Sequence, residues 1–224
     1  AVLGADQIHQ RTELIKKGVW VGLTGIVSIA TVSMINSGFT QSLIYQSLWG
    51  ALLGLISGVL ALGILPFLEM GFRILTPLKL IEIANPNHPL MKRLLMEAPG
   101  TYQHSMSVAN LAEGAAEAIG ADALLVRAGA FFHDVGKIKR PMYFTENQSQ
   151  WDNPHEGIPP QLSANIIISH IREGLELARE YQLPQEIYEF IATHQGTMRA
   201  GHFYNLAKEQ SGEQNINQDD YTYP

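Results

Sequence analysis

The chain of 224 residues contains no cysteine. This absence excludes disulfide bonds, thiolate metal ligands and cysteine nucleophiles, and it suits a reducing compartment. The formal net charge is −6, and lysine and arginine form no cluster that would offset it. A protein with this charge balance is poorly suited to the phosphate backbone of DNA or RNA, so we expect no nucleic-acid polymer as a partner.

Charge is also missing from one long segment of the chain. Residues 18–68 contain no Asp, Glu, Lys, Arg or His, and they hold two apolar runs, 18–35 and 43–68, separated by a polar turn at 36–38. A helix as long as the first run spans about 27 Å, close to the thickness of the hydrocarbon core of a bilayer. A buried hairpin or a signal peptide would also be apolar, but a second run directly after the first favours two transmembrane helices.

Basic residues flank the two apolar runs on their outer sides. Lys16 and Lys17 precede the first run, Lys79 and Lys92 follow the second, and the stretch between the runs carries no charge. The positive-inside rule places both outer flanks in the cytoplasm. We therefore predict a multi-pass protein of the cell (plasma) membrane whose part after about residue 70 is cytoplasmic.

The sequence divides into four regions. We expect a cytosolic flank at 1–17, two transmembrane helices at 18–68, a linker rich in proline at 69–98, and a helical domain at 99–224 that stops short of its natural end. The fold class predicted from this order is all-α, with two transmembrane helices followed by a helical bundle.

Apolar periodicity locates the helices of the last region. It predicts helices at 101–119, 123–133, 162–180 and 185–195, with a further helical stretch at 203–209. Thr101 and Asp122 are the predicted N-caps of the first two, and Pro184 opens the fourth. Residues 140–160 are predicted to form a long loop, and the polar residues 210–224 a flexible tail.

Four of the eight histidines fall on four different predicted helices. The helical repeat places His104 with Val108, Leu111, Ala115 and Ile119, and His133 with Leu125 and Gly129. It places His170 with Ile167, Ile171, Gly174 and Ala178, and His194 with Ile187, Phe190 and Ile191.

A single histidine on an apolar face is more often a hydrogen-bonded core residue than a ligand. Four of them, with Asp134 directly after His133, would be a costly set of buried polar groups unless an ion coordinates them. Neutral imidazole suits iron, manganese and zinc, and a carboxylate can bridge two ions. The pattern therefore predicts a metal site at His104, His133, Asp134, His170 and His194.

Two further residues have alternative interpretations. Lys137 follows Asp134 by three positions, where it can neutralise a substrate phosphate or complement the dipole at a helix end. His155 lies in the predicted loop, where it is either a surface residue or part of the mouth of a substrate site.

Several segments carry a resemblance to a known family. Residues 132–137, Phe-His-Asp-Val-Gly-Lys, resemble the signature of HD-domain phosphohydrolases, and residues 97–105 resemble the motif that supplies their first histidine ligand. Four further segments narrow the resemblance to a smaller group of these proteins, namely 139–141, 146–148, 152–155 and 166–170. Together with the two apolar runs upstream, they resemble the seven-transmembrane HD family of cyclic-di-AMP phosphodiesterases, the PgpH type, over roughly residues 18–224.

The resemblance implies a centre of two divalent metal ions, most often iron or manganese. His104, His133 and Asp134 match the first ligand group with Asp134 bridging, and His170 and His194 match the second. The family often has a second histidine where this chain has Gln195, which we expect to line the site. The family's last aspartate ligand belongs to a later helix, and nothing after His194 matches it.

The function implied is hydrolysis of cyclic-di-AMP to the linear dinucleotide by a membrane-anchored, metal-dependent phosphodiesterase that acts in signalling. In it, Asp134 and Lys137 are the predicted catalytic residues, and Lys137, His155 and Gln195 the predicted substrate-binding residues. Two other functions stay open, an HD-type nucleotide phosphohydrolase of different specificity and a catalytically silent metal- or nucleotide-binding signalling module. A homodimer is also an open alternative.

Overall fold

The structure, a computed structural model, describes residues 11–37, 41–72, 74–148, 153–211 and 216–224. In these residues the regular structure is helical, and the only extended pairing is an isolated antiparallel bridge between Arg199 and Thr222. The all-α prediction is therefore confirmed. The chain forms two compact units, residues 1–81 and residues 82–224.

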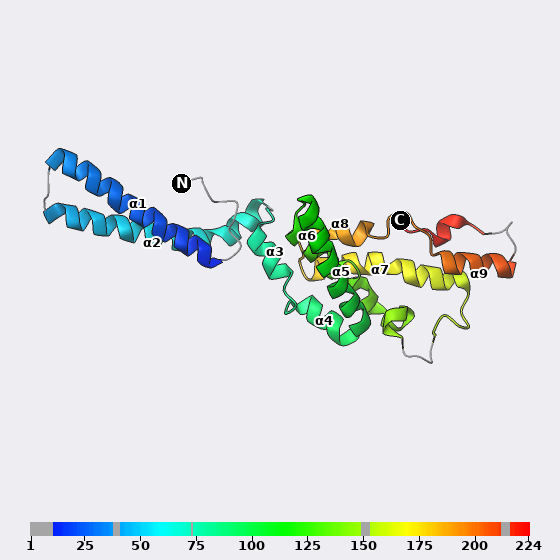
Figure 1. The fold of residues 1–224 in the computed structure, drawn as a ribbon. Coiled ribbons are helices and arrows are strands. Elements are labelled where there is room, and N and C mark those ends of the chain that lie inside the picture. The colour runs from blue at the N-terminus through cyan, green and yellow to red at the C-terminus, as the bar shows by residue number, and fades with distance from the viewer. Residues whose placement is uncertain (1–10, 38–40, 73, 149–152, 212–215) are drawn as a thin grey trace. The chain divides into compact units, whose positions relative to one another are not determined.

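The first unit is a pair of long helices, α1 (Arg11–Ser37) and α2 (Gln41–Phe72), which run side by side (Figure 1). The stretches Ile15–Ile35 and Ile44–Glu69 are long and apolar enough to cross a membrane. Large side chains such as Trp20 and Leu53 are 65% and 60% exposed. A helix that is apolar on its outer faces needs an apolar solvent, which a bilayer supplies. Of the predicted turn, residues 36 and 37 belong to α1 and residue 38 lies outside the described part.

Glycines line the contact between α1 and α2. A Cβ atom added to Gly54 would lie 2.3 Å from the Cα of Gly22, and one added to Gly18 would lie 3.0 Å from the Cα of Gly58. Small residues at four-residue spacing let two helix backbones approach closely, which is a common packing mode in membranes. This spacing is visible in the sequence, although the apolar periodicity alone does not predict which faces meet.

The segment predicted as a linker is mostly helical. It holds the end of α2, α3 (Pro77–Ile83) and α4 (Pro89–Glu97). In α4, Leu90, Met91 and Leu94 are fully buried. Two of the prolines that indicated a linker, Pro77 and Pro89, stand at the first positions of α3 and α4, where a proline costs no helical hydrogen bond.

The second unit begins its bundle with α5 (Pro99–Ile119) and α6 (Ala123–Phe132). The Asp122 side chain accepts a hydrogen bond from the Leu125 amide, so its predicted role as the N-cap of α6 is confirmed. The N-cap prediction for Thr101 is wrong, because α5 already begins at Pro99 and Thr101 is buried in its first turn.

The buried face of α5 differs from the predicted one. Its buried residues are small, namely Thr101, Ser105, Ala109 and Ala116. Leu111 and Ile119, predicted to point inward with His104, are 77% and 82% exposed. Short side chains let α5 pack closely on α6, so close approach of the backbones decides the orientation of this helix, whereas the prediction relied on the larger apolar residues.

The remaining elements follow the predicted order. They are 3-10 turns η2 (Val135–Lys139), η3 (Pro141–Tyr143) and η4 (Thr145–Asn147), then α7 (Pro160–Glu180), α8 (Gln185–Thr193), α9 (Gly201–Ser211) and η6 (Gln218–Tyr221). The predicted loop at 140–160 thus contains η3, η4 and the start of α7. Residues 149–152 lie outside the described part.

The prediction of a flexible tail is wrong for its described end. Tyr221 and Tyr223 are 4% and 8% exposed, and Tyr221 packs in a small cluster with Ala164, Tyr204 and Ala207. The amide of Tyr223 donates to the Met198 carbonyl. Two aromatic side chains therefore supply enough apolar area to order a segment that is polar on average.

Candidate metal centre

Helix ends position three of the site's side chains. His133 directly follows α6 as its C-cap, Asp134 comes next, and His194 is the C-cap of α8. His170 lies in the middle of α7 and is 1% exposed. His104 lies in the second turn of α5, with 47% of its side chain exposed.

Asp134 is the point where the four histidines meet. Its Oδ2 atom lies 3.1 Å from Nε2 of His133 and 3.7 Å from Nε2 of His104. Its Oδ1 atom lies 3.4 Å from Nε2 of both His170 and His194. The structure therefore brings together all five residues predicted as ligands. They form two groups that could each hold a metal ion and that share one carboxylate.

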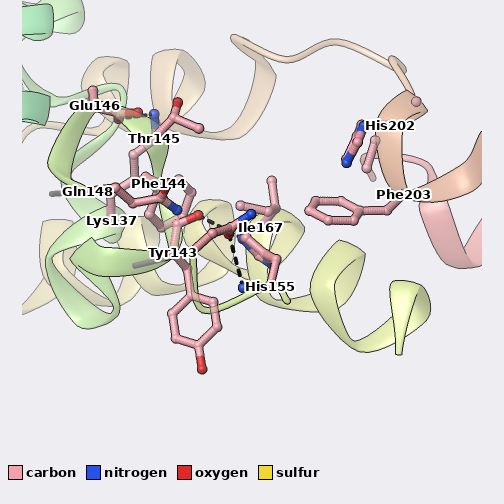
Figure 2. A pocket seen from close by; sticks show the side chains of 13 residues that line it. Lys137, Tyr143, Phe144, Thr145, Glu146, Gln148, His155, Ile167, His202 and Phe203 are labelled. Atoms are coloured by element: carbon pink, nitrogen blue, oxygen red, sulfur yellow. Dashed lines mark hydrogen bonds and ion pairs between the residues drawn. The ribbon is translucent and has the colours of Figure 1, made fainter. Parts of the chain in front are cut away.

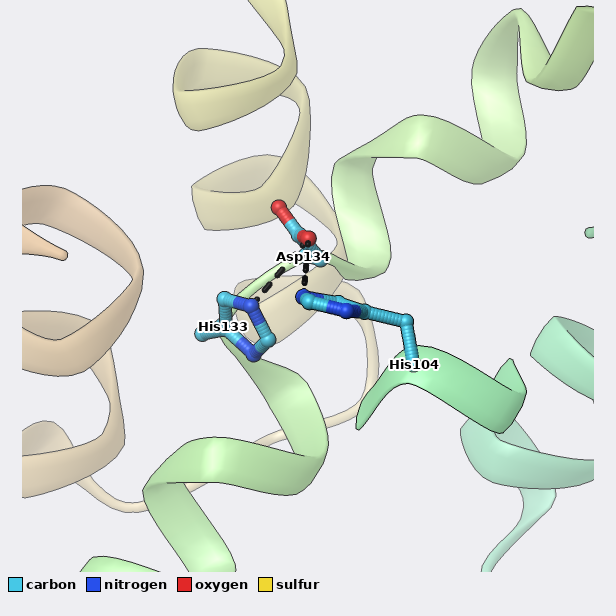
Figure 3. Close-up of side chains that lie close together, drawn as sticks. All are labelled: His104, His133 and Asp134. Atoms are coloured by element: carbon cyan, nitrogen blue, oxygen red, sulfur yellow. Dashed lines mark ion pairs between the residues drawn. The ribbon is translucent and has the colours of Figure 1, made fainter. Parts of the chain in front are cut away.

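Figure 3 shows the first of these groups. His133 and His104 come from different helices, and both rings are directed at Asp134. In the second group, Nε2 of His170 and Nε2 of His194 are only 3.2 Å apart. Each oxygen of the carboxylate thus faces a different pair of imidazoles, which is the arrangement expected of a bridging ligand.

The other ring nitrogen of three histidines contacts a backbone carbonyl. Nδ1 lies 2.7 Å from the Ala130 oxygen in His133, 2.6 Å from the Ile167 oxygen in His170, and 3.0 Å from the Ile191 oxygen in His194. A carbonyl can only accept, so Nδ1 must carry the hydrogen in each ring. The lone pair of neutral imidazole is then on Nε2, the atom directed at Asp134. Metal-bound histidines are held in this way.

The geometry inside the site fits a cation. Three Nε2 lone pairs and a carboxylate converge, and like lone pairs at 3.2 Å repel one another unless a positive charge lies among them. The Oδ1 atom of Asp134 is buried and has no hydrogen-bond partner among the described residues. Leaving such an oxygen unpaired is costly, and coordination of an ion would satisfy it.

The electrostatics of the site agree with this interpretation. Burial would raise the pKa of Asp134, but the nearby rings of His133 and His194 and the charge of Lys137 hold it well below its usual range. Burial would lower the pKa of His133, yet the Asp134 carboxylate raises it overall. Burial lowers the pKa of His170 to about 4, so this imidazole is neutral near pH 7. The carboxylate attracts positive charge, which a proton or a metal ion can supply.

Lys137 is held between two carboxylates. Its Nζ atom lies 2.9 Å from Oδ2 of Asp134 and 2.7 Å from Oε1 of Glu146, and its side chain is only 12% exposed. Burial would lower the pKa of Lys137, but Asp134 and Glu146 raise it, so the ammonium stays charged. Lys137 also lies in the last turn of η2, and its ammonium group is directed at these two carboxylates.

A pocket of about 430 Å³ adjoins the site through Lys137, Phe144 and Glu146 (Figure 2). His155 lines it, and its Nε2 atom lies 2.9 Å from the Tyr143 carbonyl oxygen. Its ring packs between the rings of Tyr143 and Phe203, with centroids 5.2 Å and 4.7 Å away. His155 is thus a wall residue of the pocket. Gln195 follows His194 in the turn after α8 and is not among the residues that line this pocket.

Several residues around the site were not predicted. Glu146, Thr101 and Asn147 form a hydrogen-bonded group beside Lys137, and Arg140 pairs with the buried Glu173, 2.6 Å away. Glu146 and Asn147 belong to one of the segments that carry the family resemblance, and that is the only signal in the sequence that could have indicated them.

Two family models match the chain. Residues 101–219, more than half of the chain, match the model described as the HD domain. Residues 1–76 match the model described as a 7TM receptor with intracellular HD hydrolase. The chain therefore belongs to the HD domain family, and its apolar helices and this second match indicate a membrane protein. HD domains are metal-dependent, in agreement with the residues that meet at Asp134.

Two curated relatives carry the name cyclic-di-AMP phosphodiesterase PgpH. The protein of Bacillus subtilis (strain 168) is 43% identical over 225 residues, which cover 100% of this chain and 31% of the relative. That of Listeria monocytogenes serotype 1/2a (strain 10403S) is 44% identical over 216 residues, 96% of this chain and 30% of the relative. The chain thus spans about three tenths of the length of these relatives. The predicted resemblance is confirmed.

A solved structure agrees with the curated relatives. It is the crystal structure of the L. monocytogenes phosphodiesterase PgpH HD domain in complex with cyclic-di-AMP. It is 51% identical in sequence with a TM-score of 0.59, and the match covers 62% of this chain and 64% of that chain.

Proposed function

We propose that the protein containing this chain is a membrane-anchored, metal-dependent phosphodiesterase that hydrolyses cyclic-di-AMP to the linear dinucleotide. The observation that supports it most is the Asp134 carboxylate, each of whose oxygens faces a different pair of imidazoles. Relatives whose names state this activity, and a solved HD domain bound to cyclic-di-AMP, support the substrate.

The proposed ligands are His104, His133 and Asp134 for one divalent ion, and Asp134, His170 and His194 for the other. Iron or manganese is the expected metal, since histidine and carboxylate ligands suit both. When bound, such ions lower the pKa of water and stabilise negative charge on phosphoryl oxygens. The histidines, held by backbone carbonyls, keep their Nε2 atoms in place without rearrangement.

Lys137 is the residue proposed to contact the scissile phosphate. An ammonium group has three N–H donors. Asp134 and Glu146 occupy two of them, and the residue also lines the pocket, so a third donor is available for a phosphoryl oxygen. In the reaction a water oxygen bonds to phosphorus, the bond from phosphorus to the 3′ oxygen breaks, and that oxygen takes up a proton. Lys137 would offset the charge that grows on the phosphoryl group.

The pocket beside Lys137 is proposed to hold part of the dinucleotide. His155, Tyr143 and Phe203 offer aromatic faces of the kind on which bases stack. We place the HD domain in the cytoplasm and the two apolar helices in the cell membrane, because basic residues flank the helices on that side.

The test is turnover by the purified full-length protein loaded with Mn²⁺. We expect cyclic-di-AMP to be converted to the linear dinucleotide, and chelation of the metal to stop the reaction. Hydrolysis of other nucleotides but not of cyclic-di-AMP would favour an HD phosphohydrolase of different specificity. Binding of cyclic-di-AMP without turnover in the presence of Mn²⁺ would favour a silent signalling module. A full-length protein that binds no transition metal would exclude the enzyme.

A further inference from the structure

The 3-10 turn η4 contacts both α5, which carries His104, and Lys137, which in turn contacts Asp134. From its contacts we infer that Glu146 and Asn147 are positioning residues, which set the distance between α5 and the turn that carries Asp134. The inference rests on the proposed metal function, and it concerns residues to which the sequence predicted no role.

Asn147 caps the amino end of α5 from a distant position in the chain. The N-cap position of α5 is Ala98, which has no side-chain hydrogen bond to offer. The amide of Thr101 donates instead to Oδ1 of Asn147 at 3.1 Å, and Nδ2 of Asn147 donates to the Thr101 hydroxyl at 2.8 Å. An unpaired amide in the first helical turn is thus satisfied by a residue 46 positions further along.

Glu146 connects the same helix turn to Asp134. Its Oε1 atom accepts from the Thr101 hydroxyl at 3.0 Å and from Nζ of Lys137 at 2.7 Å. Lys137 in turn lies 2.9 Å from Oδ2 of Asp134. A continuous line of hydrogen bonds and ion pairs therefore runs from the first turn of α5 to the shared carboxylate.

The backbones meet at the same place. A Cβ atom at Gly100 would lie 1.8 Å from the Glu146 carbonyl oxygen, so no larger residue fits there without moving η4. His104 lies one turn further along α5 and is the only member of the ligand set that this helix supplies. His104 is also the least buried ligand, 3.7 Å from Asp134, so its distance to the carboxylate depends on how α5 is held.

This dependence should be selective. His170 and His194 come from α7 and α8, and the hydrogen bonds that the Glu146 and Asn147 side chains make within the described residues go to Thr101 and Lys137 instead. The contacts reach Asp134 at Oδ2, the oxygen that faces His104 and His133. Loss of the η4 contacts should therefore weaken the ion held by His104 and His133 more than the ion held by His170 and His194. A general loss of packing would weaken both.

The experiment compares Asn147→Ala and Glu146→Gln with Asn165→Ala and Glu176→Gln, whose side chains are exposed on α7. Mn²⁺ titration of the full-length protein should show one ion bound about 10- to 100-fold more weakly in the first pair and no change in the second pair. Turnover of cyclic-di-AMP by Asn147→Ala should fall in kcat with KM unchanged. Amide hydrogen exchange in the first turn of α5 should be faster in Asn147→Ala, and Asn147→Asp, which keeps the acceptor, should restore protection.

Two outcomes would overturn the inference. One is unchanged Mn²⁺ affinity together with unchanged exchange at the start of α5. The other is equal weakening of both ions. A wild-type protein that binds no Mn²⁺ would instead contradict the proposed function, and hydrogen exchange would then still test whether Asn147 caps α5.

Discussion

At the scale of single residues, Asp134 is the side chain on which the contacts of the site converge. It is 2% exposed, it faces four imidazoles, and it also pairs with Lys137. Its two oxygens are not equivalent, because His104 and His133 lie on one side and His170 and His194 on the other. Changing one histidine at a time can therefore separate the two proposed ions.

We predict that His104→Ala and His170→Ala each remove one of the two proposed ions, and that the double variant removes both. The physical reason is that each histidine belongs to a different ligand group. Metal analysis of the purified full-length protein measures this directly, with His202→Ala as an exposed histidine control that should keep both ions. Loss of both ions in either single variant would show that the chain has one site rather than two.

The sequence predicted all five proposed ligands, because a histidine directly before an aspartate and three more on apolar helices are local patterns. It did not predict Glu146 and Asn147 as partners of Thr101, since contacts across 45 and 46 positions leave no periodic trace. The predicted buried face of α5 was wrong for a related reason. Hydropathy weights the large Leu111 and Ile119, whereas the helix packs through its small residues.

At the scale of elements, the approach of η2 to α7 sets where Asp134 lies relative to His170. A Cβ atom at Gly136 would lie 1.8 Å from the His170 carbonyl oxygen and 2.6 Å from the Gly174 amide nitrogen. Both obstacles are backbone atoms of a helix, which cannot rotate away as the end of a side chain can. The glycine after the His-Asp pair is therefore required by packing between two elements.

We predict that Gly136→Ala destabilises the protein by about 1–3 kcal/mol or more, because the added methyl group overpacks this contact. The matched control is Gly114→Ala, where a Cβ atom meets nothing within 4 Å on an exposed part of α5. That change should stabilise by up to about 1 kcal/mol, as alanine is the better helix former. Urea unfolding of the detergent-solubilised protein gives both values, and similar midpoints for the two variants would contradict the prediction.

At the scale of the whole molecule, two kinds of solvent act on one chain. The helices α1 and α2 expose large apolar side chains, while residues 82–224 bury theirs around a polar centre. The sequence alone predicted this division, because the lack of charged residues at 18–68 can be recognised without knowledge of tertiary contacts. The cytoplasmic side of the membrane is the side that we propose for the HD domain.

Residues 1–224 contain no cysteine, so single introduced thiols can test that proposal in a full-length protein whose other cysteines, where present, are replaced. In intact cells a membrane-impermeant maleimide should label Ser37→Cys, at the end of α1, and should label Glu176→Cys on α7 only after permeabilisation. The reason is that basic residues hold the outer flanks of both helices on the cytoplasmic side. The reverse pattern would place the HD domain outside the cytoplasm.

Because backbone carbonyls hold three of the histidines, the site should tolerate amino-acid substitutions at the positions that orient these rings. In many metal centres a carboxylate side chain orients each imidazole, so substitution of that carboxylate residue can weaken metal binding or lower activity. Here the orienting atoms are the main-chain oxygens of Ala130, Ile167 and Ile191, which every amino acid possesses. Substitutions at these three positions can alter packing but cannot delete the acceptor. The backbone geometry of the helices thus sets the orientation of the three imidazoles.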